Sequence, residues 1–214
     1  MFSEQELIDC SVGEYRDSNN GCDGGFIEAS LDYALVNGIG DGYSYPYAGG
    51  EGRCRFNRPK QAKPGFNHGD GSVTVDDGLV DYVMINGSEK LMMAAVAKFG
   101  PIAAYVEMKH AKSYGGNGRN SVFYSPECTR TKYRDLDHAV LITGYGTTSN
   151  GQDYWMVKNS WGTDWGKNGY MMLTRGENHC GIGYQAFVPI MKSASRLASA
   201  DVGSDGRLIV PRWK

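Results

Sequence analysis

Two polar residues near the ends of predicted strands have the side chains that acid/base catalysis requires. His138 follows Asp137 at the start of an apolar segment, and Asn159 lies between a second apolar segment and the glycine-rich residues 161–170. An asparagine side-chain oxygen can accept the imidazole N–H, which fixes the tautomer and leaves the other ring nitrogen facing a nucleophile. No cysteine or serine of the sequence stands where this pair could use it. The sequence therefore indicates a base and its orienting amide without an evident nucleophile.

The other residues of metal-ligand type form no recognisable motif. Three histidines lack such a context and are expected to be structural or exposed: His68, His110 and His179. The five cysteines are widely spaced and contain no C-x-x-C pair. Disulfides of a secreted or lysosomal protein are therefore expected, and because five is odd, at least one thiol has no partner within the chain. We expect no metal site and no cofactor.

Helices are predicted early in the chain and strands late. Ser3 and Glu6 form a capping box that predicts a helix start, and apolar spacing predicts buried helices over 26–36 and 88–99. Short segments rich in β-branched and aromatic residues predict strands at 102–108, 139–143, 154–158, 170–174 and 186–190. This order indicates an α+β fold. We expect a helical lobe over 1–87, an antiparallel, barrel-like lobe over 88–191 and a flexible tail over 192–214.

Composition and charge argue against two classes of partner. The 214 residues carry a formal net charge of −2, and Lys and Arg are scattered, so we expect no nucleic-acid-binding surface. No apolar segment approaches the roughly 18 residues of a membrane span, and the first residues lack the pattern of a signal peptide. The 30 glycines favour a loop-rich architecture in which loops carry the site.

The motifs around His138 and Asn159 resemble those of the papain-like cysteine peptidases, the family of papain and cathepsins L and B. The matching segments are SEQELIDCS at 3–11, GCDGG at 21–25, YPY at 45–47, GPIAAYVE at 100–107, DHAVLITGYG at 137–146, NSWGTDWGKNGY at 159–170 and HCGI at 179–182. The resemblance covers residues 2–191 and implies a papain-like two-lobe fold. By position it implies that His138 is the catalytic base, that Asn159 orients it and that Trp161 covers their hydrogen bond.

One family motif has no counterpart in the sequence. Members of the family carry a glutamine and then a C-G-S-C-W type motif near the mature N-terminus, whose second cysteine is the nucleophile. The resemblance also implies two disulfides, Cys10–Cys54 and Cys128–Cys180, and a partner for Cys22 within the missing motif. We therefore expect an N-terminally truncated chain that lacks the nucleophile and the oxyanion-stabilising glutamine and is inactive as it stands.

The same resemblance implies which residues contact substrate. Gly24 and Gly25 would let an extended peptide hydrogen-bond to the backbone, although the pair could also form an ordinary turn. The pocket for the second residue on the acyl side of the cleaved bond would favour a bulky apolar group and be lined by Phe26, Ile27, Leu136, Ala139 and, at its base, Gln185. The Gln185 amide could instead accept a polar or basic group.

Two functions remain open. The first is a papain-like cysteine endopeptidase represented by an incomplete chain, and the second is a non-catalytic homologue that binds peptides or peptidase inhibitors through the retained cleft. The first is favoured because His138, Asn159 and the unpartnered Cys22 are all retained. The resemblance implies peptide or protein substrates, cystatin-like inhibitors and a lysosomal or extracellular location, and we expect a monomer.

Overall fold

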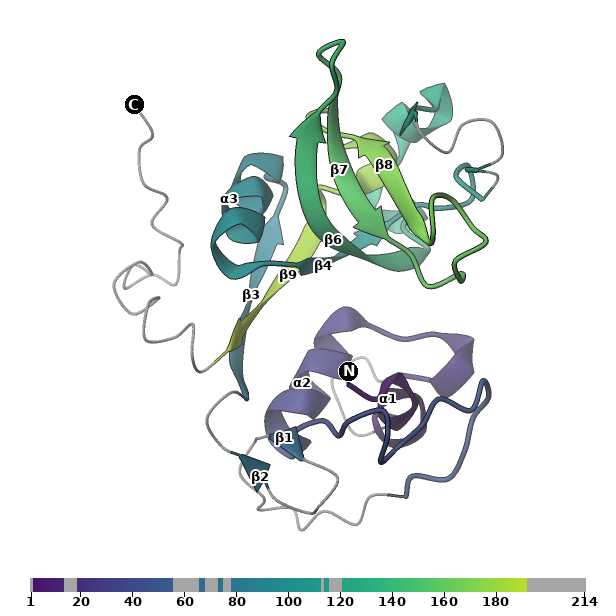
Figure 1. Cartoon of the computed structure of the whole chain (residues 1–214), viewed down its shortest axis with the longest axis vertical. Coiled ribbons are helices and arrows are strands. Elements are labelled where there is room, and N and C mark those ends of the chain that lie inside the picture. The colour runs from purple at the N-terminus through teal and green to yellow at the C-terminus, as the bar shows by residue number, and fades with distance from the viewer. Residues whose placement is uncertain are drawn as a thin grey trace. The chain divides into compact units, whose positions relative to one another are not determined.

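The chain forms two compact units (Figure 1). The computed structural model describes residues 2–13, 19–55, 66–67, 73–74, 78–112, 114–115 and 121–191. The first unit contains the residues up to Tyr82 and the described end of the chain from Pro189, and the second is Val83–Val188. The lobe boundary expected at residues 87 and 88 stays a prediction, and the tail expected over 192–214 lies outside the described residues.

The first unit is built on helices that are joined by buried polar contacts. Its helical elements are α1 (Glu4–Cys10), the 3-10 turn η1 (Gly21–Asp23) and α2 (Ile27–Asn37). The Ser3 side chain caps α1 by accepting from the Glu6 N–H at 3.0 Å, as predicted, and the Ser3 N–H donates to the Gly40 carbonyl at 2.9 Å. The fully buried Glu6 carboxylate accepts from the Tyr33 hydroxyl at 3.0 Å and from the Gly40 N–H at 2.6 Å. This one carboxylate therefore joins α1 to α2 and to the segment that follows α2.

The segment after α2 is also fixed to α1. A disulfide joins Cys10 to Cys54. The buried Gln5 side chain accepts from the Ala48 N–H at 2.8 Å and donates to the Gly50 carbonyl at 2.7 Å. Two short strands, β1 (Phe66–Asn67) and β2 (Val73–Thr74), pair antiparallel.

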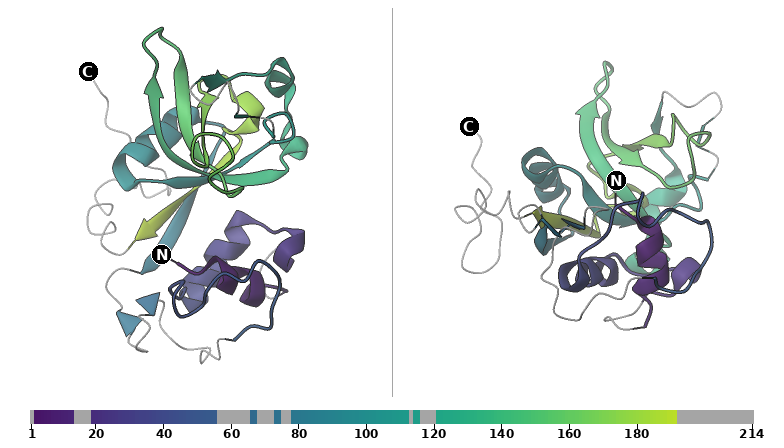
Figure 2. Two further views of the ribbon diagram at one scale, coloured as in Figure 1. Left: turned by 45° about the vertical axis from the view of Figure 1, so that its right-hand side comes forward. Right: turned by 60° about the horizontal axis from the view of Figure 1, so that its bottom comes forward.

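The sheet that lies mainly in the second unit is shown from two further sides in Figure 2. It has seven strands, in the order β3-β9-β4-β6-β7-β8-β5. Neighbouring pairs from β4 to β8 are antiparallel, whereas β5 pairs parallel with β8. The strands are β3 (Leu79–Asn86), β4 (Ile102–Val106), β5 (Val122–Phe123), β6 (His138–Thr147), β7 (Asp153–Lys158), β8 (Tyr170–Thr174) and β9 (Gln185–Met191). The sheet is thus mostly antiparallel and open, with β3 and β5 at its edges.

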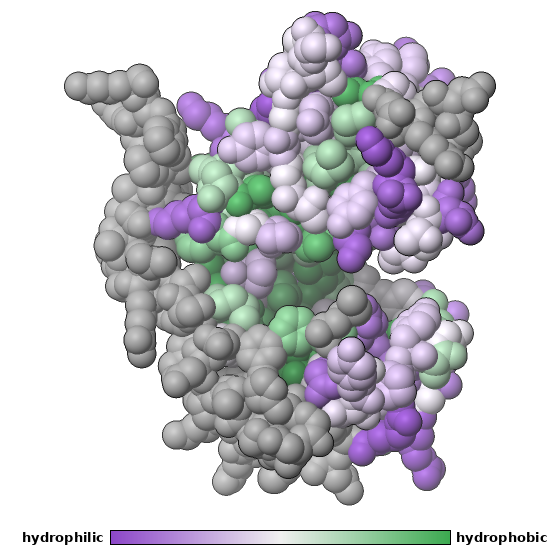
Figure 3. Space-filling view, viewed as in Figure 1, coloured by the Kyte–Doolittle hydropathy of each residue, from purple (hydrophilic) through white to green (hydrophobic). Residues whose placement is uncertain are grey.

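Alternation along β4 places three side chains in the core of the second unit. Ile102, Ala104 and Val106 are fully buried, while the two residues between them are half-buried. Helix α3 (Glu89–Phe99) packs against β4 and β6, and the buried side chains on it are Met92, Ala95 and Val96. Figure 3 shows apolar residues gathered over α3 and over the neighbouring β4 and β9. Burying each large apolar side chain contributes roughly 1.5–3 kcal/mol, so this layer holds the sheet in place.

The predicted α+β class is confirmed, and most predicted segments correspond to observed elements. The helices expected over 26–36 and 88–99 are α2 and α3, and the five expected strands are β4, β6, β7, β8 and β9. The edge strands β3 and β5 were not predicted from the sequence. Half of β3 is exposed without regular alternation, and β5 has only two residues, so neither carries the period-2 pattern that marks a half-buried strand.

Candidate active site

His138 is the first residue of β6 and is held by the neighbouring strand. It pairs with Val106 at the end of β4. The preceding Asp137 donates its N–H to the Val106 carbonyl at 3.2 Å, and its side chain accepts from the Met108 N–H at 2.8 Å. The main chain on the N-terminal side of His138 is therefore anchored twice, which limits where the imidazole can lie.

Asn159 reaches the same place from the end of β7. It follows the last residue of that strand, is only 7% exposed, and donates its main-chain N–H to the Gly169 carbonyl at 2.9 Å. Its side-chain Oδ1 lies 2.8 Å from His138 Nε2 and accepts from the Ser160 N–H, also at 2.8 Å. The antiparallel pairing of β6 with β7 thus brings together two residues that are 21 positions apart in the sequence.

The Ser160 contact determines which protons the pair carries. A peptide N–H can only donate, so the Asn159 atom that faces it must be the oxygen. That oxygen also faces His138 Nε2, so Nε2 must carry the proton in the neutral ring. His138 Nδ1 then holds a free lone pair and has no hydrogen-bond partner among the described residues. A ring nitrogen with a free lone pair can accept a proton from a nearby donor.

An aromatic side chain lies beside the His138 ring. The ring centroids of Trp161 and His138 are 5.0 Å apart with an interplanar angle of 39°, and Trp161 itself is 38% exposed. Trp165 meets Trp161 edge-on at 5.3 Å and donates its indole N–H to the Lys112 carbonyl at 3.2 Å. Trp161 is thus held against the imidazole, and its role as a cover over the hydrogen bond stays a prediction.

Three of the expected pocket residues lie in the second unit, and strand register relates two of them. Ala139 of β6 is opposite Tyr105 of β4, and the β4–β9 register, extended by one position from Ala104–Ala186, places Gln185 opposite the same tyrosine. Opposed residues of antiparallel strands share a face, so Ala139, Tyr105 and Gln185 form one row. Leu136 lies beside Gly181, where an added side-chain carbon would meet Leu136 at 2.7 Å and Tyr184, the residue before Gln185, at 3.0 Å. We call Leu136, Ala139, Tyr105 and Gln185 the apolar wall.

Sequence reasoning missed two residues of this neighbourhood, Tyr105 and Tyr133. Tyr105 is the half-buried member of the alternation in β4, a signal that only gains meaning once the register with β6 is known. Tyr133 begins the 3-10 turn η4 (Tyr133–Asp135), and its hydroxyl donates to Gln185 Oε1 at 2.9 Å. Nothing in the sequence links Tyr133 with Gln185, which lies 52 residues further along the chain.

The other expected substrate contacts, Gly24, Gly25, Phe26 and Ile27, lie in the first unit, between η1 and the start of α2. Gly24 has φ +116°, a conformation that favours glycine, and a side chain at Gly25 would collide with the Asn19 carboxamide, which accepts from the Phe26 N–H at 2.8 Å. The backbone conformation at Gly24 and the lack of space at Gly25 therefore account in part for the presence of glycine at both positions. The Gly25 N–H and carbonyl have no hydrogen-bond partner among the described residues, so an extended peptide could still bind there.

All five cysteines are described, and their pairing agrees with the expectation. Disulfides join Cys10 to Cys54 and Cys128 to Cys180, each within one unit, and Cys22 is free and exposed on η1. The Cys22 N–H donates to the Glu51 carboxylate at 2.7 Å. The structure thus leaves one thiol in the chain.

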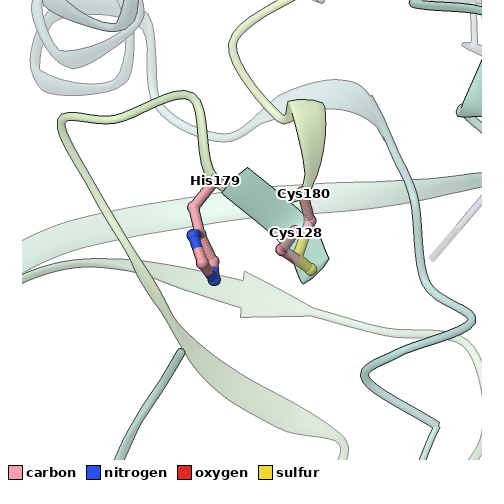
Figure 4. A group of neighbouring side chains, drawn as sticks. All are labelled: Cys128, His179 and Cys180. Atoms are coloured by element: carbon pink, nitrogen blue, oxygen red, sulfur yellow. A yellow bond between two sulfur atoms is a disulfide. The ribbon is translucent and has the colours of Figure 1, made fainter. Parts of the chain in front are cut away.

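Cys128, His179 and Cys180 place potential metal-ligand atoms within 4.8 Å of one another (Figure 4). Both sulfurs are joined in a disulfide and so offer no thiolate. His179 Nε2 accepts from the Ser125 N–H at 3.0 Å, so the buried Nδ1 carries the proton, and it has no partner among the described residues. Burial lowers the pKa of His179, although Glu177 and Glu89 act in the opposite direction. The group therefore serves as packing around a buried neutral imidazole.

Comparison with known sequences identifies the family. Residues 1–190 match the family described as papain family cysteine protease. The chain belongs to the papain family of cysteine proteases. The predicted papain-like fold is confirmed by structures that share at least 30% of their residues with this chain.

Individual relatives are of the cathepsin L and bromelain types. A cathepsin L-like peptidase of Aedes aegypti is 39% identical over 193 residues, covering 89% of this chain and 50% of that protein. The digestive procathepsin L 3 of the Tenebrio molitor larval midgut has a TM-score of 0.70 at 36% identity, over 88% of this chain and 55% of that one. Bromelain of Ananas comosus in complex with the E64 inhibitor has a TM-score of 0.66 at 30% identity, over 88% and 77% of the two chains.

The chain spans about half the length of the curated relatives that it matches. Among the described residues, no helix combines the length and the apolar character that crossing a bilayer requires.

Proposed function

We propose that this chain provides the base and the orienting amide of a cysteine endopeptidase, which cleaves peptide bonds by acyl transfer to a thiol outside these 214 residues. The observation that carries the proposal is the 2.8 Å contact between His138 Nε2 and Asn159 Oδ1, which leaves Nδ1 open. Membership of a cysteine protease family supports the reaction class.

The proton transfers follow from the open nitrogen. His138 Nδ1 takes the proton of the attacking thiol, and the thiolate adds to the peptide carbonyl carbon. The protonated Nδ1 then donates to the leaving amine as the C–N bond breaks, which leaves a thioester. In the second half, Nδ1 removes a proton from water, the hydroxide attacks the thioester, and the carboxylic acid leaves while the thiol is restored. Asn159 acts through His138 by holding Nε2–H in both halves.

The cysteines of the chain support an inactive state for these 214 residues alone. Four of them are joined in two disulfides. The remaining thiol, Cys22, lies on the exposed 3-10 turn η1 and not at the start of an α-helix. Loss of the nucleophile from a catalytic unit of this kind costs roughly a million-fold in rate. We therefore expect no measurable peptide hydrolysis without a further thiol.

The partners and the location belong to the same proposal. Extended peptides are the expected ligands, because the Gly25 backbone is open to hydrogen bonding and the apolar wall can contact a side chain. The proposal also includes cystatin-like inhibitors, which would occupy the same surfaces. It further includes a monomeric state. Two disulfides favour an oxidising compartment, either lysosomal or extracellular.

Complementation tests the proposal. The chain is expressed alone and as a fusion with the N-terminal part of the mature Aedes aegypti relative, chosen to carry a glutamine and a C-G-S-C-W type motif, and both are assayed with a fluorogenic peptide amide. We expect hydrolysis and epoxysuccinyl labelling of the added cysteine in the fusion only, with hydrolysis abolished by His138→Ala but retained in His110→Ala. A folded fusion that binds peptide without cleaving it would instead favour the non-catalytic homologue.

A further inference from the structure

The turn between β3 and α3 contains an asparagine within an acceptor sequence for a sugar chain. Asn86 is the last residue of β3 and is followed by Gly87 and Ser88. Asn-x-Ser or Asn-x-Thr, with any residue except proline in the middle, is the signal for N-linked glycosylation. Asn86-Gly87-Ser88 is the only triplet of this kind in the 214 residues. The sequence therefore offers a single acceptor.

The fold directs the Asn86 side chain outward. At the end of β3, Ile85 is only 4% exposed, whereas the next residue, Asn86, is exposed. Successive side chains of a strand point to opposite faces, so burial of Ile85 turns Asn86 toward solvent. The Asn86 carboxamide has no hydrogen-bond partner among the described residues. Modification of this amide would therefore cost no contact that the structure describes.

The turn that carries the acceptor is anchored and borders open space. The Gly87 N–H donates to the Tyr184 carbonyl at 3.2 Å, which fixes the turn to the segment before β9. Gly87 has φ +67°, a conformation that favours glycine. A side-chain carbon added at Gly87 would meet no described atom within 4 Å. A bulky, solvated group on the neighbouring asparagine needs such space.

Ser88 has a structural role that explains only part of the triplet. Its side chain caps α3 by accepting from the Leu91 N–H at 3.3 Å. Aspartate caps a helix about as well as serine does, whereas only serine or threonine completes the acceptor sequence. The cap also makes no demand on Asn86, which lies two positions earlier. Substitution at Ser88 can therefore separate helix capping from glycosylation.

A second exposed turn has the same shape but lacks the hydroxyl group. Asn150 is exposed at the tip of the β6–β7 hairpin, and Gly151 after it has φ +84° with no described atom within 4 Å of an added side-chain carbon. The next residue is Gln152, so the acceptor sequence is incomplete. Asn150 is thus a matched comparison for Asn86.

We propose that Asn86 is the acceptor of an asparagine-linked glycan. Its Nδ2 attacks the anomeric carbon of an oligosaccharide carried on a lipid diphosphate, in a step that a transferase catalyses. A C–N bond forms as the anomeric C–O bond breaks, the lipid diphosphate leaves, and the amide loses one proton to the transferase. Two disulfides are consistent with passage through the oxidising secretory compartments where this transfer takes place. The modification goes beyond the proposed function and does not depend on acyl transfer.

Expression of the full chain behind a cleavable secretory signal in animal cells tests the inference. The chain is recovered from cells and medium alike, because the transfer precedes export. Peptide N-glycosidase in heavy-oxygen water then removes the glycan and converts its asparagine to labelled aspartate. Peptide mass spectrometry should find this label at Asn86. The glycan should be lost in Asn86→Gln and in Ser88→Asp, which retains a capping side chain, and kept in Ser88→Thr.

The matched control is Asn150→Gln, which should leave the glycan in place. An unlabelled Asn86 in the unsubstituted chain would overturn the inference. A glycan that persists in Asn86→Gln or in Ser88→Asp would overturn it as well, because the acceptor would then be another residue or the hydroxyl group would not matter. The readout is a peptide mass and not hydrolysis, so each of these results would leave the proposed function standing.

Discussion

The Ser160 peptide N–H donates to Asn159 Oδ1 at 2.8 Å, and this contact determines which nitrogen of the neutral His138 ring carries the proton. Because the same oxygen faces His138 Nε2, the neutral ring must carry its proton on that nitrogen. A main-chain group next to the asparagine thus selects the tautomer of a residue on another strand.

Asn159→Ala should allow the neutral His138 ring to carry its proton on either nitrogen. Without the Asn159 oxygen, no described group accepts from Nε2–H. The tautomer with the proton on Nδ1 is then no longer disfavoured. Nitrogen-15 NMR of the His138 side chain at pH 8 should show mainly Nε2–H in the unsubstituted chain and a mixture in the variant. Asn150→Ala, at the tip of the β6–β7 hairpin, is the matched control. Identical spectra for all three proteins would contradict the assignment.

The intact, unreduced chain should contain one reactive sulfhydryl. Cys22 is exposed and free, whereas the other four cysteines are joined in pairs. Titration with a chromogenic disulfide under denaturing conditions should give one thiol per chain, and none in Cys22→Ser. A count of three in the unsubstituted chain would mean that one bridge is absent in solution.

Glu89→Gln should destabilise the second unit. The Glu89 carboxylate accepts from the Trp155 indole N–H at 2.7 Å and from the main-chain N–H groups of Gly176 and Asn178 at 2.9 and 2.6 Å. A glutamine amide offers one oxygen in place of two, and its NH2 group would face at least one of these N–H donors. Hydrogen bonds to charged groups contribute about 1.5–3 kcal/mol each. Urea unfolding should show a loss of about 2 kcal/mol. Asp164→Asn, an equal charge change at an exposed position, should lie within about 0.5 kcal/mol of the unsubstituted chain.

The stability of the second unit should fall as the pH is lowered from 7.5 toward 5. Burial lowers the pKa of His179 below its ordinary value near 6.5, so the unfolded chain binds a proton that the folded unit resists. Stability from this group is complete above the unfolded pKa and is lost below it, at up to about 1.4 kcal/mol per pH unit, until the folded pKa is reached. A protonated His179 ring would also carry a proton on Nε2, which would then face the Ser125 N–H.

His179→Gln should make the free energy of unfolding less dependent on pH across that range, because glutamine does not titrate. His110→Gln, at a half-exposed histidine, is the comparison. Parallel pH profiles for the unsubstituted chain and His179→Gln would show that His179 is protonated equally in both states.

The contact between His138 and Asn159 could be predicted from sequence, because the determinants of its geometry are local. His138 and Asn159 each sit at the end of a strand with strong apolar character, and the chain between those strands contains Gly151, which allows a hairpin. The helix starts were predicted for the same reason, since Ser3 and Ser88 cap the residues immediately after them.

The features that were missed depend on contacts between distant segments. The Tyr133–Gln185 hydrogen bond spans 52 positions and depends on where η4 meets the start of β9. Tyr105 enters the apolar wall only through the register of β4 with two other strands. The edge strands lack the alternation that burial on one face imposes. Glu6 was predicted as half of a capping box, but its carboxylate bonds instead across 27 and 34 positions, while the Ser3 N–H donates to the Gly40 carbonyl.

The anchoring of Asp137 to Val106 and Met108 has one further consequence. It means that the rotational freedom of the segment before the imidazole is already lost when the second unit folds, whether or not a sulfur is nearby. A thiol that reaches Nδ1 then meets a preorganised acceptor, so the entropic penalty of assembling the reacting pair falls mainly on the incoming segment.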